Sequence, residues 1–487
     1  DDHGYTQLGT EDYTDTDNWE YIGPSGLWAQ EYGDSDTWMQ TNMVDDPVQV
    51  SAYMHNSSIH AAGALTLDAK ANETIDAIVV AGSVAIAGAG GVGVGGSGAG
   101  VNTGNKITTE VRAYIQGSGP SGIEAGSAKL TAQDTSTISA TTNASSVAGS
   151  LAGAGAVAAS IGVAIAENEI TNIVEAYIKD AASVVATVGS IELNALENAT
   201  IDAASVAASI AAAFSAGLGI ALSGSGADAT NFIANSVQVY IENSTVETRT
   251  LHGYTTAEQV SSLNPGERVL LLGDVGGGTT GQVYEYAGQA VSNLNLGAQT
   301  YTDPEWGLVG QSADYVQDIL IDAQSTSTIV SVVGAASVGA GWGTVAAAGA
   351  MGYSKAANLI GVDPADETST LLNQVLAYVV NSHLQSAGDI SITASSTDRL
   401  DSISFAGSVA VAVGLGGALA GSGTETTNRV SSKVHAYMMD TSATAVGDIK
   451  VQASSDSRVL KANSLGVAVA VSLGAASVAG SEAVNTI

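Results

Sequence analysis

Acidic residues gather in two short stretches near the start of the chain, where their types suit a calcium site. Asp15 and Asp17 lie just after Asp12, and Asp34 and Asp36 form the second stretch. Carboxylate oxygens are the ligands that calcium prefers in proteins. Neither stretch fits the twelve-residue calcium loop or the glycine-rich calcium repeat of solenoids. Two interpretations stay open: a calcium site built from these aspartates, and solvated acidic turns.

Aromatic residues close to acids form a second candidate site, for carbohydrate. "GQVYEYAG" supplies Tyr284 and Tyr286, "DPEW" supplies Trp306, and the first forty residues supply Trp19 and Trp38. Exposed rings of this kind stack on sugar faces while nearby acids bind hydroxyls. The segment at 281–306 is similar to small chitin- or cellulose-binding modules. The alternative is that these rings form the core of a small domain that has few other large residues.

The residue types give little support for catalysis, nucleic-acid binding, thiolate metal sites or membrane insertion. No nucleophile, base and orienting acid can be assembled locally, so we expect no enzyme. The chain has 14 Lys and Arg against 48 Asp and Glu, a net charge of −34, which excludes nucleic acid as a partner. The absence of cysteine excludes disulfides and thiolate metal sites. Apolar runs such as 150–166 lack the Leu, Phe and flanking cations of membrane spans, so we expect no membrane insertion.

A tyrosine in a recurring motif indicates how the chain is organised: the motif reads V-x-A-Y followed by an apolar residue, with Val in place of Ala in the fourth copy. The motif tyrosines are Tyr53, Tyr114, Tyr177, Tyr240, Tyr378 and Tyr437, with separations of 61, 63, 63, 138 and 59 residues. The long separation contains two additional segments, 251–312 and 362–374, and it matches the others once both are removed. Six copies of a unit of about 61 residues are typical of a repeat architecture, in which each unit buries its apolar face on its neighbours.

The units read as β-strands. After the motif and a polar turn comes an alternating stretch such as "GDISITA", in which Ile390, Ile392 and Ala394 share one face. The Gly/Ala runs that follow also alternate, since the large residues of 465–473 lie two positions apart. Interspersed glycine costs a helix about 1 kcal/mol per residue, so these runs are predicted to be strands. We expect the six tyrosines to stack at the same point of successive coils.

The units "AYIKDAASV", "VYIENSTV", "GDISITA" and "GSVAVAVG" resemble those of giant repeat-containing surface and secreted proteins of bacteria, the filamentous-haemagglutinin-like exoproteins and adhesins. The resemblance covers roughly 50–250 and 313–487. It implies an elongated β-solenoid at the cell surface or outside the cell. The sequence leaves open whether one unit makes one wide coil or several narrow ones.

These observations predict an all-β fold: an elongated β-solenoid or β-helix of about six repeats, at 46–250 and 313–487. The segment 251–312 is predicted to be a small inserted β module, and 362–374 a short helical insertion. Residues 1–45 echo the end of that module, as Leu8 and Trp19 match Leu296 and Trp306. We therefore expect 1–45 to be the C-terminal remnant of a second module, and the chain to be a piece of a longer polypeptide.

The function follows from the second face of the Gly/Ala strands. Opposite large residues such as Val84 and Ile86 lie only Ala, Gly and Ser, a smooth face that another sheet can approach closely. Either a second layer of the same molecule covers this face, or copies of the chain associate through it. We expect a structural, adhesive segment of an extracellular fibre or sheath that self-associates through these Gly/Ala-rich faces. The alternative is a carbohydrate-binding surface protein that uses the solenoid as a spacer.

Overall fold

The computed structural model describes residues 47–312, 316–364 and 373–487. All of these belong to one compact unit, Pro47–Ile487. The predicted module remnant at 1–45 and most of the predicted helical insertion at 362–374 lie outside the described residues. Within the described residues the fold is all-β, as predicted, and the long Gly/Ala runs are strands.

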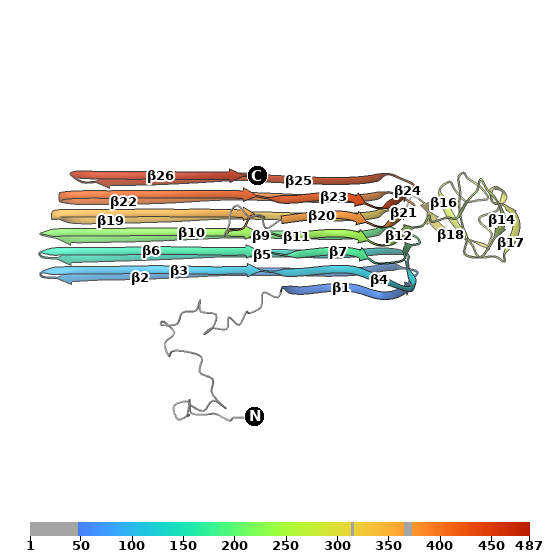
Figure 1. Cartoon of the computed structure of the whole chain (residues 1–487), viewed down its shortest axis with the longest axis horizontal. Coiled ribbons are helices and arrows are strands. Elements are labelled where there is room, and N and C mark those ends of the chain that lie inside the picture. Colours follow the sequence, from blue (N-terminus) through green and yellow to red (C-terminus); the bar gives the residue numbers. More distant parts are fainter. Residues whose placement is uncertain (1–46, 313–315, 365–372) are drawn as a thin grey trace, which may run out of the picture. The chain divides into compact units, whose positions relative to one another are not determined.

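The third coil shows how one repeat folds. Its chain passes through β7 (Ile173–Lys179), β8 (Val184–Ala186), β9 (Ile191–Ser215) and β10 (Leu218–Ile233), and then β11 (Ser236–Glu242) starts the next coil. β11 lies parallel to β7, with Tyr240 paired to Tyr177. One repeat therefore makes one wide coil (Figure 1).

The other coils follow the same order. The first two contain β1 (Val48–His60), β2 (Ala64–Ala89), β3 (Val92–Ile107), β4 (Thr109–Ala125), β5 (Ser127–Ala152) and β6 (Gly155–Ile170). The fourth contains β11, β12 (Thr245–Thr248) and β19 (Ile319–Ile360). The last two contain β20 (Asn373–Val380), β21 (His383–Ser386), β22 (Ile390–Val430), β23 (Ser432–Met439), β24 (Ser442–Ala445), β25 (Ile449–Val471) and β26 (Gly474–Thr486).

The long strands form two layers. An outgoing layer consists of β2, β5, β9, the first halves of β19 and β22, and β25. The chain then turns, and a return layer consists of β3, β6, β10, the second halves of β19 and β22, and β26. The strand pairs between coils are parallel and in register apart from three local irregularities, so like positions of successive repeats lie above one another.

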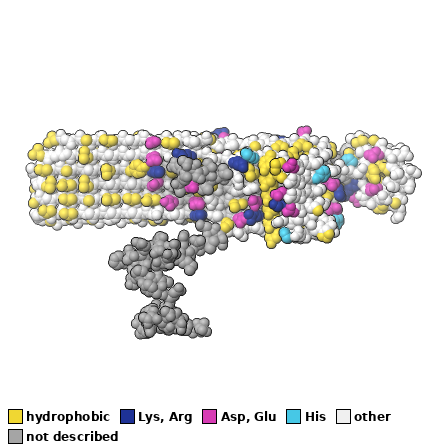
Figure 2. Space-filling view, viewed as in Figure 1, with side chains coloured by type: hydrophobic (Ala, Val, Ile, Leu, Met, Phe, Trp, Pro, Cys, Tyr) yellow, Lys and Arg dark blue, Asp and Glu magenta, His cyan; other side chains and the backbone are white. Residues whose placement is uncertain are grey.

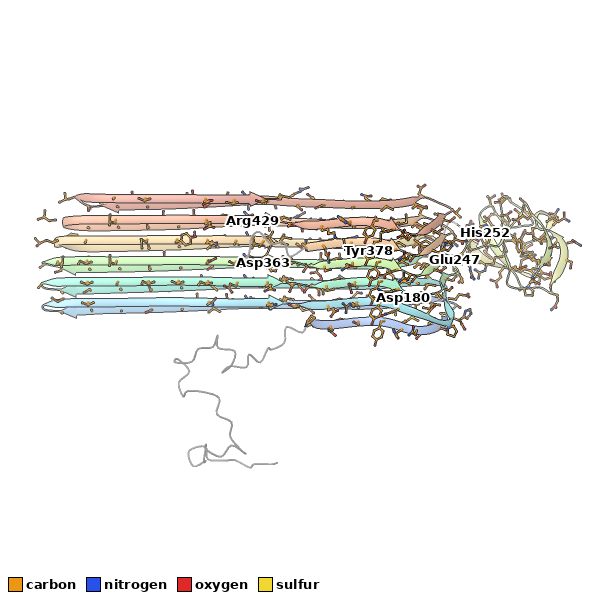
Figure 3. All side chains as sticks on the ribbon, viewed as in Figure 1. Asp180, Glu247, His252, Asp363, Tyr378 and Arg429 are labelled. Atoms are coloured by element: carbon orange, nitrogen blue, oxygen red, sulfur yellow. The ribbon has the colours of Figure 1, made fainter. Side chains whose placement is uncertain are left out.

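The motif tyrosines form a continuous stack along the coils. Each ring lies 4.7–5.2 Å from the next, centroid to centroid, with planes within 9° of parallel. Figure 3 labels Tyr378 within this stack. The recurrence of tyrosine is thus explained by packing between neighbouring coils.

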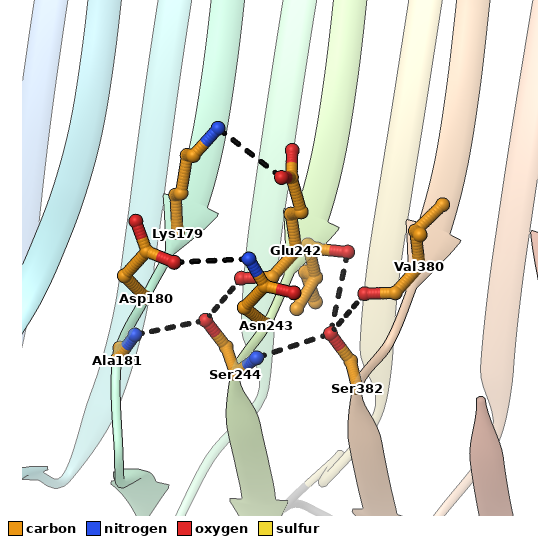
Figure 4. Close-up of polar contacts among 9 residues, drawn as sticks. Lys179, Asp180, Ala181, Glu242, Asn243, Ser244, Val380 and Ser382 are labelled. Atoms are coloured by element: carbon orange, nitrogen blue, oxygen red, sulfur yellow. Dashed lines mark hydrogen bonds and ion pairs between the residues drawn. The ribbon is translucent and has the colours of Figure 1, made fainter. Parts of the chain in front are cut away.

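The polar turn after each tyrosine is a left-handed corner. The residue three places after the tyrosine has a positive φ in every coil, and these residues are Asn56, Gly117, Asp180, Asn243, Asn381 and Asp440. Asn, Asp and Gly are the residues that adopt this conformation at least cost, which explains their recurrence there. Neighbouring corners bind one another: Asn243 Nδ2 donates to Asp180 Oδ1 over 3.0 Å, and the Ala181 N–H donates to Ser244 Oγ (Figure 4).

An asparagine ladder fixes the return strands. It runs through Asn105, Asn168, Asn231, Asn358, Asn428 and Asn485, and each side-chain amide donates to the next amide oxygen over 2.8–2.9 Å. A shift of one residue in any of the four inner strands would turn its asparagine to the other face and break two of these bonds. The ladder therefore specifies the register of the coils.

The inserted segment forms a small β module, as predicted for 251–312. Its strands are β13 (Tyr254–Thr255), β14 (Gln259–Leu263), β15 (Arg268–Leu270), β16 (Gln282–Tyr286), β17 (Val291–Asn295) and β18 (Trp306–Gln311), with a 3₁₀ turn at Leu296–Ala298. β13, β15, β16 and β18 form one sheet, and β14 pairs with β17. Within that sheet β15 and β16 form an antiparallel pair.

Replacing one asparagine of the ladder should destabilise the solenoid. Asn231→Ala leaves the buried amide groups of Asn168 and Asn358 each short of one partner, which costs about 1–3 kcal/mol. The midpoint of urea unfolding, followed by circular dichroism, should fall. Asn485→Ala is the matched control, because Asn485 is exposed and makes one such bond. Equal midpoints for the two variants would contradict the role of the ladder.

Candidate interaction surface

The three described aromatic candidates for sugar contact lie in the core of the inserted module. Tyr284, Tyr286 and Trp306 are only 7%, 3% and 8% exposed. Trp306 packs against Tyr286 and Tyr301 with centroids 5.0 and 4.7 Å apart. A ring covered on both sides by its own chain cannot stack on a sugar. The expectation of glycan contact at these three residues is therefore corrected: they form the module core.

The other residues predicted for ligand binding are not among those described. Trp19 and Trp38, and the calcium candidates Asp15, Asp17, Asp34 and Asp36, lie outside the described residues. Among the residues that are described, no group of three or more His, Asp or Glu side chains has the arrangement needed to hold a metal ion.

Removing the module's tryptophan should unfold the module. Trp306→Ala takes away a buried indole that contacts two tyrosines, which costs about 3–5 kcal/mol. Limited proteolysis should then cut within 251–312 faster than in the parent chain. Trp342→Ala is the control, because that indole is 57% exposed. Unchanged proteolysis of Trp306→Ala would show that the ring does not hold the module together.

A cluster of buried carboxyl groups lies inside the coils. Asp134 and Glu197 are register partners on β5 and β9, and both are fully buried. Asn172 Nδ2 donates to Asp134 Oδ2 over 2.8 Å and to Glu197 Oε1 over 3.1 Å. Burial, together with the charge of Asp134, raises the pKa of Glu197 well above its usual value. Burial also raises the pKa of nearby Glu73 to about 7.

These raised pKa values predict that the solenoid loses stability as the pH rises. A carboxyl whose pKa is raised by folding gives its full contribution below its unfolded pKa of 4.5 and loses it as the pH rises through the folded value, about 7 for Glu73. The urea midpoint should therefore be lower at about pH 8 than at about pH 5.

Glu197→Gln should weaken this pH dependence, because a neutral amide of the same shape needs no proton. Glu192→Gln is the control, since Glu192 lies on the same strand and its carboxylate faces outward beside Lys129. A Glu197→Gln variant whose midpoint falls with pH as steeply as that of the parent chain would contradict the assignment.

A large part of every coil contains no charged residue. We call it the blade, and it consists of residues 77–105, 135–166, 203–227, 323–354, 402–424 and 462–481, which contain no Asp, Glu, Lys, Arg or His. Each segment runs out along the outgoing layer, turns, and comes back along the return layer. Figure 2 shows one face of it: charged side chains begin in a band where the blade ends and are absent from the rest of the blade on that face.

Small residues fill the space between the two layers of the blade. Ala148, Ala211 and Ala221 are fully buried there with their neighbours. Ser209 Oγ lies 2.6 Å from Ser223 Oγ across the layers, and Ser150 Oγ donates to the Gly93 carbonyl over 2.8 Å. Direct contacts between such short side chains require the two sheets to approach closely, which Ala, Gly and Ser allow.

The large residues of the blade point outward. Ile86, Met351 and Leu419 are 81%, 70% and 65% exposed, and many Val, Ile, Leu and Phe side chains of both layers share this orientation. The hypothesis that copies associate through the Gly/Ala-rich face is therefore corrected, because that face is already covered by the second layer of the same coil. The exposed faces are the ones that carry the large apolar side chains.

The polarity of the blade is the reverse of that expected for a solenoid in water. Serine hydroxyls lie inside, while apolar side chains lie outside on both layers. With about ten residues of 3.3 Å each and six strands 4.8 Å apart, each face measures roughly 900 Å². The largest apolar patch of an ordinary monomer measures about 300–600 Å². The sequence contains the signal for this surface, namely large residues alternating with Ala, Gly and Ser, but not the direction in which each set points.

Within the residues that the structure describes, no helix has the length and apolar character needed to cross a membrane. No protein-family model, curated protein sequence or solved structure matches the chain.

Proposed function

We propose that this chain is a structural segment of an extracellular bacterial fibre or surface protein, and that copies of it associate side by side through the outward faces of the blade. The observation that carries the proposal is the uncharged apolar exterior of the blade, repeated in six coils on both layers. An exposed apolar surface of this size marks a site where another molecule binds, because leaving the surface in water costs free energy.

The dimensions of the blade support a partner of the same kind. A face of roughly 900 Å² is close to the 800 Å² or so that each partner contributes to a stable protein interface. The blade is built from in-register parallel strands, so its outward side chains are held in fixed rows and need little ordering on association.

The charges outside the blade determine where association occurs. Neighbouring coils there are joined by ion pairs such as Lys129 Nζ with Glu192 Oε2 at 2.8 Å and Lys179 Nζ with Glu242 Oε1 at 3.2 Å. The excess acidic residues make copies repel one another, which opposes contact outside the blade. Salt screens this repulsion, so side-by-side association should strengthen with ionic strength.

A single charge in the blade should disrupt association. Leu222→Asp places an unpaired carboxylate at the proposed interface, which costs several kcal/mol and should lower the association constant more than about tenfold. Sedimentation velocity and negative-stain images of the parent chain should show laterally associated particles, and the variant should be largely monomeric. Leu272→Asp is the matched control, because Leu272 of the inserted module is 55% exposed and Leu222 is 53% exposed. A parent chain that stays monomeric at all salt concentrations would refute the proposal.

A further inference from the structure

The outgoing face of the blade carries a continuous apolar ridge. One register position holds a β-branched residue in all six coils: Val84, Val147, Ile210, Val338, Val409 and Val469. In the central coils the outward residues on either side are small, for example Ala208 and Ala212 beside Ile210. The row therefore runs along the axis of the solenoid, and in the second to fourth coils it stands above its immediate neighbours.

The return face carries a groove in the same direction. Its volume is about 630 Å³, and it crosses the second to the sixth coil between two neighbouring columns of outward residues. Ile161, Leu222, Met351, Leu419 and Val478 form its walls. Its lining contains no charged residue.

Glycines provide the depth of the groove. Gly224 lies between Ile161 and Met351 in one column, and Gly349 lies between Leu222 and Leu419 in the other. A Cβ at Gly224 would meet no atom within 4 Å, so this position is an open hole. At Gly349 a Cβ would lie 3.0 Å from Leu222 Cδ2, because that side chain leans over the glycine.

The ridge and the groove lie back to back. Ser209, next to the ridge residue Ile210, hydrogen-bonds through the blade to Ser223, which lies in the groove between Leu222 and Gly224. In the second coil, Ser146 and Ser160 make the same contact beside Val147 and Ile161. The two features are therefore at the same position along the strands on opposite faces of one blade.

We propose that the ridge of one copy packs into the groove of the next copy. This inference rests on the side-by-side association proposed above and names the two surfaces that meet. Each coil adds one residue to the ridge and one open or small position to the groove, and that position alternates between the two columns of the groove. Residues of both features therefore follow one another about every 4.8 Å along the axis. Because they lie back to back, copies can stack without any shift along the strands.

The geometry also defines the kind of assembly. Contact between two different faces is heterologous, so every added copy leaves one ridge and one groove free. Such contacts continue into an open row of solenoids when their rotation does not close a ring. A fluid hydrocarbon phase could cover the same apolar faces, but it would gain nothing from a match between a ridge and a groove. The partner that fits both features is a second copy of this chain.

Disulfide cross-linking tests the pairing directly, because the chain has no cysteine. Ile210→Cys labels the ridge, and Gly224→Cys labels the open hole in the groove. Mild oxidation of an equal mixture should give a dimer on a non-reducing gel, while each variant alone should give little. Lys129→Cys, on the outgoing layer outside the blade, should cross-link with neither. Circular dichroism checks that each variant keeps its strands.

A second variant tests the groove by filling it. Gly224→Leu should lower the association constant more than about tenfold, because the new side chain occupies the place of the ridge. Gly100→Leu is the control, since a Cβ there also meets no atom within 4 Å and Gly100 does not line the groove.

The outcomes separate this inference from the proposed function. Association with disulfides only between identical variants would overturn the ridge-to-groove pairing while keeping side-by-side association. A monomeric parent chain would overturn both. Binding of the parent chain to phosphatidylcholine vesicles without disulfides between copies would also overturn the pairing, and would assign the blade faces to lipid.

Discussion

Parallel pairing of each coil with the one before it is the interaction on which the rest of the structure depends. Most strand residues of a repeat lie beside their equivalents in the next repeat, so a side chain that suits one coil is constrained by all of them. Tyrosine rings stack, asparagine amides join into a chain, and Lys129 meets Glu192 because register brings like positions together. The same rule turns single β-branched side chains into a row on the outgoing face.

Much of the fold could be predicted from the sequence, because its signals are local and repeated. The spacing of the tyrosines indicated six coils, and large residues two apart, such as Val467 and Val469, indicated strands in runs whose alanine content suits helices. The width of a coil could not be predicted in this way. It depends on where the chain turns back, and the turn at 216–217 is marked only by Ala and Gly, which are common throughout the blade.

The direction of the side chains was the part that sequence reasoning missed. Alternation places Ile210 and Ser209 on opposite faces of the strand. Isoleucine is among the residues most often buried in proteins, so Ile210 would be expected to point inward. Here the two layers lie too close for large side chains, so the serines and alanines pack inside and the isoleucine points outward. For Tyr284 and Trp306 the sequence left two interpretations open, exposed rings for sugar and the core of a small module, and the structure places both rings in the core.

The inserted module shows what the corner between a short strand and a long one can accommodate. The chain leaves the fourth coil after β12 and rejoins it at β19, yet β19 pairs in register with β9 below and β22 above. Pairing between coils therefore does not require this corner to be short. A solenoid of this kind can therefore carry an additional domain at this corner of any coil without a change in the scaffold. The distance between two such domains would be set by the number of coils that separate them.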